Sequence, residues 1–419
     1  MQVCYDSAPA KLAIEVVETT WEASMNKGML KGKMVIGQSG GPTAVINQSL
    51  VGAVLAARQQ EAITGILGAR HGIQGIMDEN FIDLTTQSVE QLEQVAATPA
   101  AALGSVRLKP GRAECEKVFE VFRKNDVRYF FYIGGNDSAE TAHIIAEMAK
   151  EANYDFCTVH IPKTIDNDLR VTDHCPGFAS AAKFVALAFM GDDRDNRALA
   201  GVKINVVMGR HAGFLTAASA LARQEEGSAP HLIYLPERVF DVDTFKQDVK
   251  DTMAKYGRCV VAASEGIGDK DGNPIASSGE RDSHGNIQLS GTGALGDTLA
   301  AFAKEALGKG ARVRADTFGY LQRSFPTIIS EVDAREAREV GGFAVNHATS
   351  SGEPGSVAIR RLSSSPYASE CFITPLSTVA REATEMKSEY INEAGNDVTQ
   401  AWIDYVAPLV GDLPKMGSL

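Results

Sequence analysis

The feature that most constrains the fold is a regular alternation of short apolar runs with longer amphipathic stretches. The apolar runs are typical of buried β-strands, and the stretches between them have the hydrophobic period of helices. Strands that alternate with helices form parallel sheets covered by helices on both faces. The expected strands are 33–41, 62–72, 127–135, 156–163, 201–209, 231–237 and 258–266. The expected helices are 43–60, 114–126, 139–153, 212–224 and 243–257.

The alternation falls into two successive blocks. It predicts an α/β protein with two Rossmann-like domains of three layers each, parallel sheets, and an active site in the cleft between them. We assign residues 33–177 to the N-terminal domain, completed by about 322–375, and residues 178–321 to the second domain. Residues 1–32 are interpreted as an N-terminal extension and 376–419 as a C-terminal helical tail. A polar, glycine-rich segment within the second block, 268–296, is interpreted as a surface insertion, with a lid over the site as the alternative.

Charge and composition restrict the partners. The 419 residues carry a formal net charge of −12, which argues against nonspecific nucleic-acid binding. If the ligand is an anion, the basic groups that bind it must be concentrated at one site. No run approaches the ~18 apolar residues of a membrane span, and the six cysteines have neither disulfide-framework nor metal-site spacing. A cytoplasmic protein with reduced thiols and no membrane contact is therefore predicted.

Glycine or charge marks the carboxyl end of five expected strands. The motifs are GQSGGPT (37–43), IGGNDS (133–138), PKTIDND (162–168), VVMGRHAG (206–213) and ASEG (263–266). Ligands of open parallel sheets bind at these ends, where glycines let the backbone approach a phosphate and helix N-termini offer unpaired N–H groups. The pattern predicts a phosphate-binding cleft.

TIDND adds the groups that phosphoryl transfer needs, a base for the acceptor hydroxyl and a group that faces a cation. Asp166 and Asp168 lie two residues apart, so one acid can point toward the acceptor and the other toward a metal ion. The alternative is a turn rich in Asp and Asn that has no chemical role.

These motifs, in this order, resemble the phosphofructokinase family. The resemblance covers the chain from about residue 33 to its C-terminus, and rests most specifically on TIDND together with MGR. Members of the family phosphorylate the 1-hydroxyl of fructose 6-phosphate with ATP or inorganic diphosphate (pyrophosphate), and they use Mg²⁺. The resemblance implies fructose 1,6-bisphosphate as the product, in glycolysis and gluconeogenesis.

The resemblance also implies residue roles. Asp166 matches the catalytic base, and Thr164 helps to hold the transferring phosphoryl group. The expected catalytic residues are Asp166, Thr164, Lys163 and Arg210. The expected donor-binding residues are Gly40, Gly41, Arg107, Gly135, Asp137, Ser138 and Lys163. The expected sugar-phosphate residues are Thr164, Asp166, Asp168, Met208, Gly209, Arg210, Glu265, Arg314, Tyr320 and Arg323.

Two of these implications concern groups outside the single chain. Arg314 matches an arginine that crosses from a neighbouring subunit to the 6-phosphate, which implies a homo-oligomer, dimer or tetramer. Asn136 stands where most members have an aspartate that helps to hold Mg²⁺, so Asp137 or Asp166 is expected to carry more of that role.

Two charged side chains bear on the choice of donor. At the positions of Asp137 and Lys163, members that use ATP have glycine, which leaves room for the α-phosphate of the nucleotide. Two unit charges about 4 Å apart interact by about 4 kcal/mol at an effective dielectric near 20, so a carboxylate there disfavours ATP. A lysine beside the leaving phosphate stabilises the charge that develops on it. The pair indicates diphosphate, although Asp137 could instead be the N-cap of a helix that starts at Ser138.

Three alternatives stay open from the sequence. The first is an ATP-dependent 6-phosphofructokinase. The second is a related kinase acting on sedoheptulose 7-phosphate, because a grip on the 6-phosphate tolerates one more carbon. The third is a catalytically silent regulatory subunit, against which the intact Asp166, Asp168, Thr164 and Arg210 argue.

Overall fold

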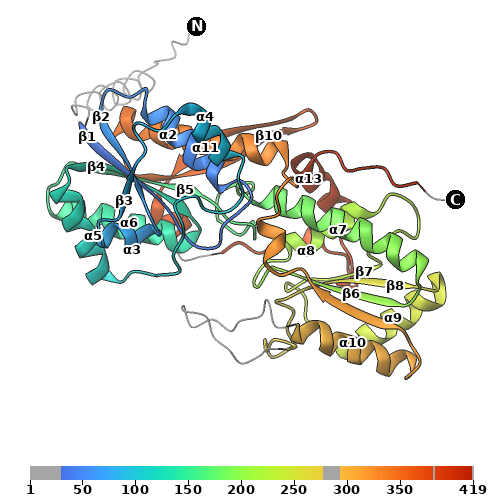
Figure 1. Cartoon of the computed structure of the whole chain (residues 1–419). Helices are drawn as coiled ribbons and strands as arrows, with labels where there is room; N and C mark the ends of the chain where they lie inside the picture. The colour runs from blue at the N-terminus through green and yellow to red at the C-terminus, as the bar shows by residue number, and fades with distance from the viewer. Residues whose placement is uncertain (1–29, 277–292, 381–382, 418–419) are drawn as a thin grey trace, which may run out of the picture.

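Two β-sheets, each covered by helices on both faces, make up the part of the chain that the computed structural model describes, residues 30–276, 293–380 and 383–417 (Figure 1). Most of the expected N-terminal extension and the middle of the 268–296 segment lie outside these residues. In the described part, no helix combines the length and the apolar character needed to cross a bilayer. Cys115, Cys157, Cys175, Cys259 and Cys371 are free thiols.

The first sheet has seven strands in the order β11-β10-β5-β4-β1-β2-β3. Its central strands are parallel, and the edge strands β3 and β11 run antiparallel to their neighbours. The strands are β1 (Gly32–Gln38), β2 (Ile63–Ala69), β3 (Phe81–Asp83), β4 (Val127–Gly134), β5 (Cys157–Pro162), β10 (Gly355–Ser364) and β11 (Tyr367–Thr374). The central strands are mostly apolar and almost entirely buried because both of their faces are covered.

Helices on the two faces of this sheet bury separate apolar clusters. One face carries α2 (Ile46–Ala57), α4 (Val89–Ala96) and α11 (Glu331–Ser351). The other face carries α3 (Gly72–Met77), α5 (Arg112–Lys124) and α6 (Asn136–Glu151). The layers place the first turns of α2 and α6 at the carboxyl edge of the sheet, where β1 and β4 end (Figure 1).

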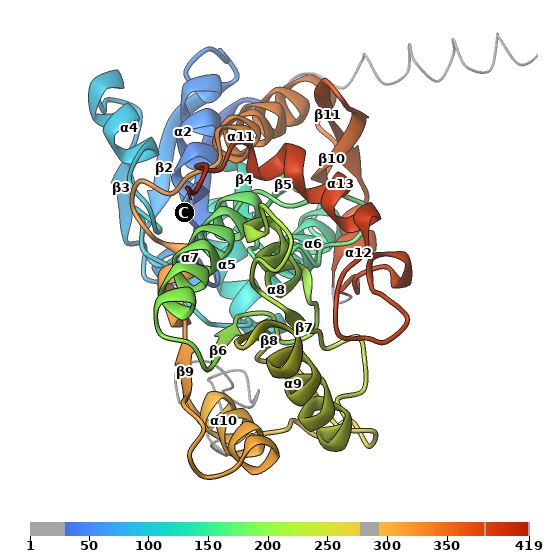
Figure 2. The same ribbon diagram turned by 90° about the vertical axis from the view of Figure 1, so that its right-hand side faces the viewer.

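The second sheet has four parallel strands in the order β7-β8-β6-β9. They are β6 (Val202–Val207), β7 (Leu232–Tyr234), β8 (Cys259–Ser264) and β9 (Val313–Thr317). One face is covered by α7 (Phe178–Ala198) and α8 (Phe214–Ala218), against which α13 (Gln400–Val410) packs. The other face is covered by α9 (Val242–Tyr256) and α10 (Ala294–Leu307), as Figure 2 shows. Short helical segments complete the described chain: η1 (Ser219–Ala222), η2 (Gly319–Arg323), α12 (Leu376–Val379) and η3 (Ser388–Tyr390).

The predicted α/β class with parallel sheets and two halves is confirmed, and the structure adds several elements that the sequence did not predict. The hairpin β10–β11 was not predicted, because its strands are partly exposed and lack a continuous apolar run. The edge strands β3 and β9 and the helices α3, α4, α7, α10 and α11 were also missed. After the second sheet, the chain returns to the first through α11 and the hairpin. Helix α13 then packs against α7 and α8, where Trp402 Nε1 donates to Ala217 O of α8 at 2.9 Å.

Candidate active site

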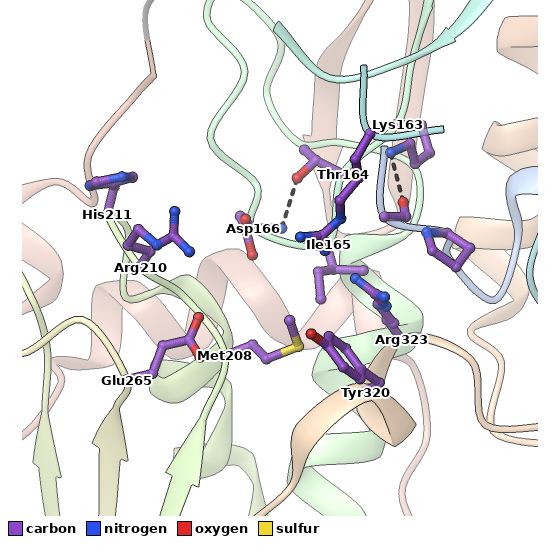
Figure 3. Close-up of a pocket in the computed structure, with 13 residues that line it drawn as sticks. Lys163, Thr164, Ile165, Asp166, Met208, Arg210, His211, Glu265, Tyr320 and Arg323 are labelled. Carbon is purple, nitrogen blue, oxygen red and sulfur yellow. Dashed lines mark hydrogen bonds between the residues drawn. The ribbon is translucent and has the colours of Figure 1, made fainter. Parts of the chain in front are cut away.

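A cavity of about 240 Å³ lies where the loops from the two sheets meet. Ten of the predicted site residues line it: Gly41, Arg107, Lys163, Thr164, Asp166, Met208, Arg210, Glu265, Tyr320 and Arg323. Figure 3 shows Asp166 in the middle, with Lys163 and Arg323 on one side and Arg210 and Glu265 on the other. The cavity therefore has one wall from each sheet.

Three lining residues were not predicted from the sequence, namely Pro42, Ile165 and His211. Each lies inside a motif that was recognised, next to a residue that was predicted. Eight predicted residues do not line the cavity: Gly40, Gly135, Asn136, Asp137, Ser138, Asp168, Gly209 and Arg314. Gly40 and Gly209 are next to lining residues in the sequence, and Asp168 is two residues beyond Asp166. The other five are the group at the start of α6 (residues 135–138) and Arg314 on β9.

The loop after β5 presents the expected base to the cavity. The Asp166 backbone N–H donates to Thr164 Oγ1 at 3.0 Å, which closes a tight turn (Figure 3). The next residue, Asn167, has a left-handed backbone with φ of 59°. Its side chain accepts a hydrogen bond from Cys175 N at 2.9 Å and donates one to Tyr405 Oη at 2.9 Å. The turn is therefore fixed from both sides, with the Asp166 side chain in the cavity.

The carboxyl groups of Asp166 and Asp168 in this loop both have raised pKa values. Burial raises the pKa of Asp166. Burial, and next the negative charge of Asp166, raise the pKa of Asp168 to about 7. Two acids that compete for ionisation in one buried place suit a general base, and they also favour a cation nearby.

Positive charge gathers on one side of Asp166, where Lys163 and Arg323 lie (Figure 3). Lys163 is only 4% exposed, and its ammonium group donates to Gly41 O at 2.7 Å. Burial, and next the nearby Arg323, lower the pKa of Lys163 to about 8. Burial, and next Arg107, also lower the pKa of Arg323. Three cations that repel one another in one wall form a binding site for a multiply charged anion.

This wall also needs glycine at position 41. A Cβ atom there would lie 2.6 Å from Arg323 Nη1, so a side chain would displace the guanidinium. The same guanidinium lies 4.4 Å from the centroid of the Tyr320 ring, which holds it from the other side.

The MGR segment after β6 forms the wall from the second sheet. Gly209 has φ of 137°, and a Cβ atom there would lie 2.5 Å from Ala212 O. Ser264 Oγ donates to Gly209 O at 2.6 Å, which anchors the turn to the end of β8. The neighbouring Arg210 has a buried Nε atom with no hydrogen-bond partner among the described residues. Such an atom in a cavity wall indicates a ligand that would accept its hydrogen.

The start of α6 differs from one sequence interpretation. The helix begins at Asn136 with Gly135 as its N-cap, so the alternative that Asp137 caps a helix starting at Ser138 is wrong. Asp137 lies in the first turn, and its carboxylate pairs with Lys109 at 3.0 Å. Gly134 is required here, because a Cβ atom would lie 2.0 Å from Ser138 Oγ.

Arg314 lies on the edge strand β9 and is exposed. Its Nη1 atom donates to Val313 O at 2.9 Å, and it does not line the cavity of its own chain.

Of the predicted metal ligands Asn136, Asp137 and Asp166, only Asp166 lines the cavity. Within the described ranges, no group of three or more His, Cys, Asp or Glu side chains could hold a metal ion. Mg²⁺ usually needs only one or two protein carboxylates, with substrate phosphates and water as its other ligands. Asp166 and Asp168, whose pKa values are raised by burial, fit that limited protein contribution.

Comparisons with known proteins agree with this geometry. A family model described as "Phosphofructokinase" matches residues 33–348. A protein from Rhodospirillum rubrum called pyrophosphate--fructose 6-phosphate 1-phosphotransferase is 54% identical over 91% of this chain and 95% of its own length. A protein of the same name from Xanthomonas campestris is 40% identical over 92% of this chain and 93% of its own length. The crystal structure of pyrophosphate-dependent phosphofructokinase from Nitrosospira multiformis has a TM-score of 0.83 and 35% identity, covering 92% of this chain and 94% of that one.

Proposed function

This chain belongs to the phosphofructokinase family, and we propose that it is the diphosphate-dependent enzyme of that family. It transfers a phosphoryl group from diphosphate to the 1-hydroxyl of fructose 6-phosphate, giving fructose 1,6-bisphosphate and phosphate. The observation that carries the choice of donor is the position of Lys163, an ammonium group buried beside Gly41 and Arg323. Relatives that align along nearly the whole chain are named for this reaction.

In this proposal, the steps are as follows. The Asp166 carboxylate takes the proton of the 1-hydroxyl as its oxygen attacks the nearer phosphorus of diphosphate. The bond from that phosphorus to the bridging oxygen breaks, and the second phosphate leaves with the electron pair. Lys163, Arg323 and Arg107 face the charge that builds up on the leaving phosphate.

The sugar phosphate lies against the opposite wall. Arg210, with its buried and unpartnered Nε atom, and Glu265 at the end of β8 contact it in this proposal. When Mg²⁺ is bound, it neutralises phosphate oxygens, and Asp166 with Asp168 are the residues that would hold it. Because a phosphoanhydride without a nucleotide and a sugar phosphate ester differ little in transfer energy, the reaction runs in both directions.

We also propose that the protein acts in the cytoplasm as a homo-oligomer. The exposed Arg314 supports this, since an arginine matched to the sugar-phosphate site lies outside the cavity of its own chain. A neighbouring subunit would bring its Arg314 to the 6-phosphate.

A donor assay tests the function. The purified protein is given saturating fructose 6-phosphate and Mg²⁺ with either diphosphate or ATP, and formation of fructose 1,6-bisphosphate is measured. We expect turnover with diphosphate at least about tenfold faster than with ATP. Asp166→Asn should lower kcat by at least a few hundredfold, within the ~10²–10⁴ range of a general base. Faster turnover with ATP would contradict the proposed donor.

A further inference from the structure

Beside the cavity, one lysine lies between two carboxylates at the start of α6. Lys109 Nζ is 3.0 Å from Asp137 Oδ1 and 3.1 Å from Glu140 Oε2. The Asp137 side chain is 55% exposed and that of Glu140 only 11% exposed, so the lysine reaches from the surface to a nearly buried acid. Lys109 is not among the residues that line the cavity, and no motif in the sequence singles it out.

Lys109 belongs to the same short segment as Arg107, which does line the cavity. This segment precedes α5 and has no regular secondary structure. Its upstream end is attached to the turn after β1, because Ser105 Oγ donates to Gly40 O at 2.6 Å and Gly40 N donates to Val106 O at 3.3 Å. Its downstream attachment to α6 is Lys109. Arg107 therefore lies between two attachment points of one segment, the contacts with Gly40 and the ion pairs of Lys109.

Lys109 is only two residues from Arg107, so its attachment to α6 affects the position of Arg107. Two residues of extended chain span at most about 7 Å, so a shift of Lys109 is transmitted to Arg107 with little slack. The ammonium group also offsets charge. Without it, the Asp137 and Glu140 carboxylates would leave two negative charges in the first turns of the helix that follows β4, near the anion-binding wall.

We propose that Lys109 is a positioning residue for the phosphoryl donor. By bridging Asp137 and Glu140, it ties the segment to α6, holds the Arg107 guanidinium in the cavity and neutralises the acidic start of that helix. It follows that Asp137 acts on donor binding through Lys109. This inference rests on the proposed function, because it takes diphosphate to be the anion that Arg107 meets.

The first test removes the charge of the lysine and keeps most of its stem. In Lys109→Met we expect the KM for diphosphate to rise about tenfold, as for a weakened charge-assisted hydrogen bond, with the KM for fructose 6-phosphate within about twofold of the wild-type value. Lys109→Arg, which can still bridge two carboxylates, should restore the KM for diphosphate to within about twofold. The matched control is Lys117→Met, a change at an exposed lysine of α5, which should alter neither KM.

The second test asks whether Lys109 works through Arg107. In an Arg107→Met background, adding Lys109→Met should raise the KM for diphosphate by less than about twofold, because the group it positions is gone. Fully additive effects, or an equal rise in the KM for both substrates of Lys109→Met, would overturn the inference. An unchanged KM for diphosphate in Lys109→Met would do the same. A wild-type protein that turns over ATP and not diphosphate would instead refute the proposed function.

Discussion

At the scale of single residues, Lys163 shows how a cation can be held ready for an anion. Its ammonium group is buried and donates to a backbone carbonyl. Burial, and next the charge of Arg323, lower the pKa of the group to about 8. The group thus lacks a carboxylate partner at hydrogen-bond distance among the described residues, and a phosphate would supply the missing negative charge.

This pKa predicts a pH dependence of donor binding. Below about pH 8, Lys163 is protonated in the free enzyme and can bind diphosphate; above it, kcat/KM for diphosphate should fall by up to about tenfold per pH unit. The measurement is kcat/KM for diphosphate between pH 6 and 10. Lys163→Met should have a low kcat/KM and lack the fall near pH 8. The same fall in both proteins would assign it to another group.

The site residues that could be predicted are those whose chemistry is visible in the sequence. Asp166 could be named because two acids at a strand end suit phosphoryl transfer, and Arg210 because MGR resembles a motif of the phosphofructokinase family. Pro42 and Ile165 could not, because apolar residues at a turn carry no chemical signal. Lys109 lies in a segment without a motif, and only the folded chain brings it to Asp137.

At the scale of elements, helix α11 fixes the segment that follows the catalytic loop. Asp333 accepts hydrogen bonds from Gly177 N at 2.7 Å and Ser180 N at 2.9 Å, which caps α7. One turn later, Glu336 Oε2 accepts from His174 Nε2 at 2.6 Å. The other nitrogen of His174 contacts Asp173 Oδ2 at 2.8 Å. A buried imidazolium between two carboxylates thus links α11 to the loop.

The charge of His174 predicts how stability depends on pH. Burial alone would lower the pKa of His174, but hydrogen bonds to Asp173 and Glu336 raise this pKa to about 9. A raised pKa means that the stabilisation is fully present below about pH 6.5, the unfolded value, and is lost as the pH rises through about 9. The pKa of Glu336 shifts in the opposite direction. Burial raises it, but the hydrogen bond and charge of His174, with hydrogen bonds from Ser369 and Tyr367, together lower it, so the contribution of Glu336 to stability is lost in acid.

The measurement is thermal unfolding of His174→Gln and wild type between pH 5 and 9.5. At pH 6, we expect the variant to be destabilised by about 3 kcal/mol, because it leaves buried carboxylates without their cation. The difference in Tm should shrink toward pH 9.5. His143→Gln on α6 serves as the control and should track wild type. A difference in Tm that is independent of pH would argue against a charged His174.

The elements themselves were predictable where one physical signal dominated. Strands such as β4 and β5 are mostly apolar because helices cover both faces of the sheet. The hairpin β10–β11 alternates polar and apolar residues toward its tip, so tertiary pairing with β5 decides its structure. In α7, the polar stretch GDDRDNRA at the C-terminal end obscures the helical period.

At the scale of the whole molecule, the exposed Arg314 predicts that active sites are shared between chains. Arg314→Ala should raise the KM for fructose 6-phosphate by about tenfold or more, as for a lost charge-assisted hydrogen bond. Asp166→Asn should be nearly inactive. If a neighbouring chain supplies Arg314, a hybrid dimer of the two variants contains one site with neither change.

Subunit mixing measures this directly. The two variants are co-refolded in equal amounts and assayed at low fructose 6-phosphate. Random pairing makes about half of the dimers hybrids with one intact site of two, so about a quarter of wild-type activity is expected. Activity no greater than the average of the two parents would place Arg314 in the site of its own chain, or in none.

The path of the chain between the sheets has a mechanical consequence. The polypeptide passes from one sheet to the other three times: after β5, after β9 and after β11. The first passage carries Lys163 and Asp166, and the second carries Tyr320 and Arg323, all of which line the cavity. Any change in the angle between the sheets must be taken up in these passages. The first two of these passages therefore carry both the hinge of such a motion and residues that line the cavity. A rotation that opens the cleft would also move those residues away from the substrates.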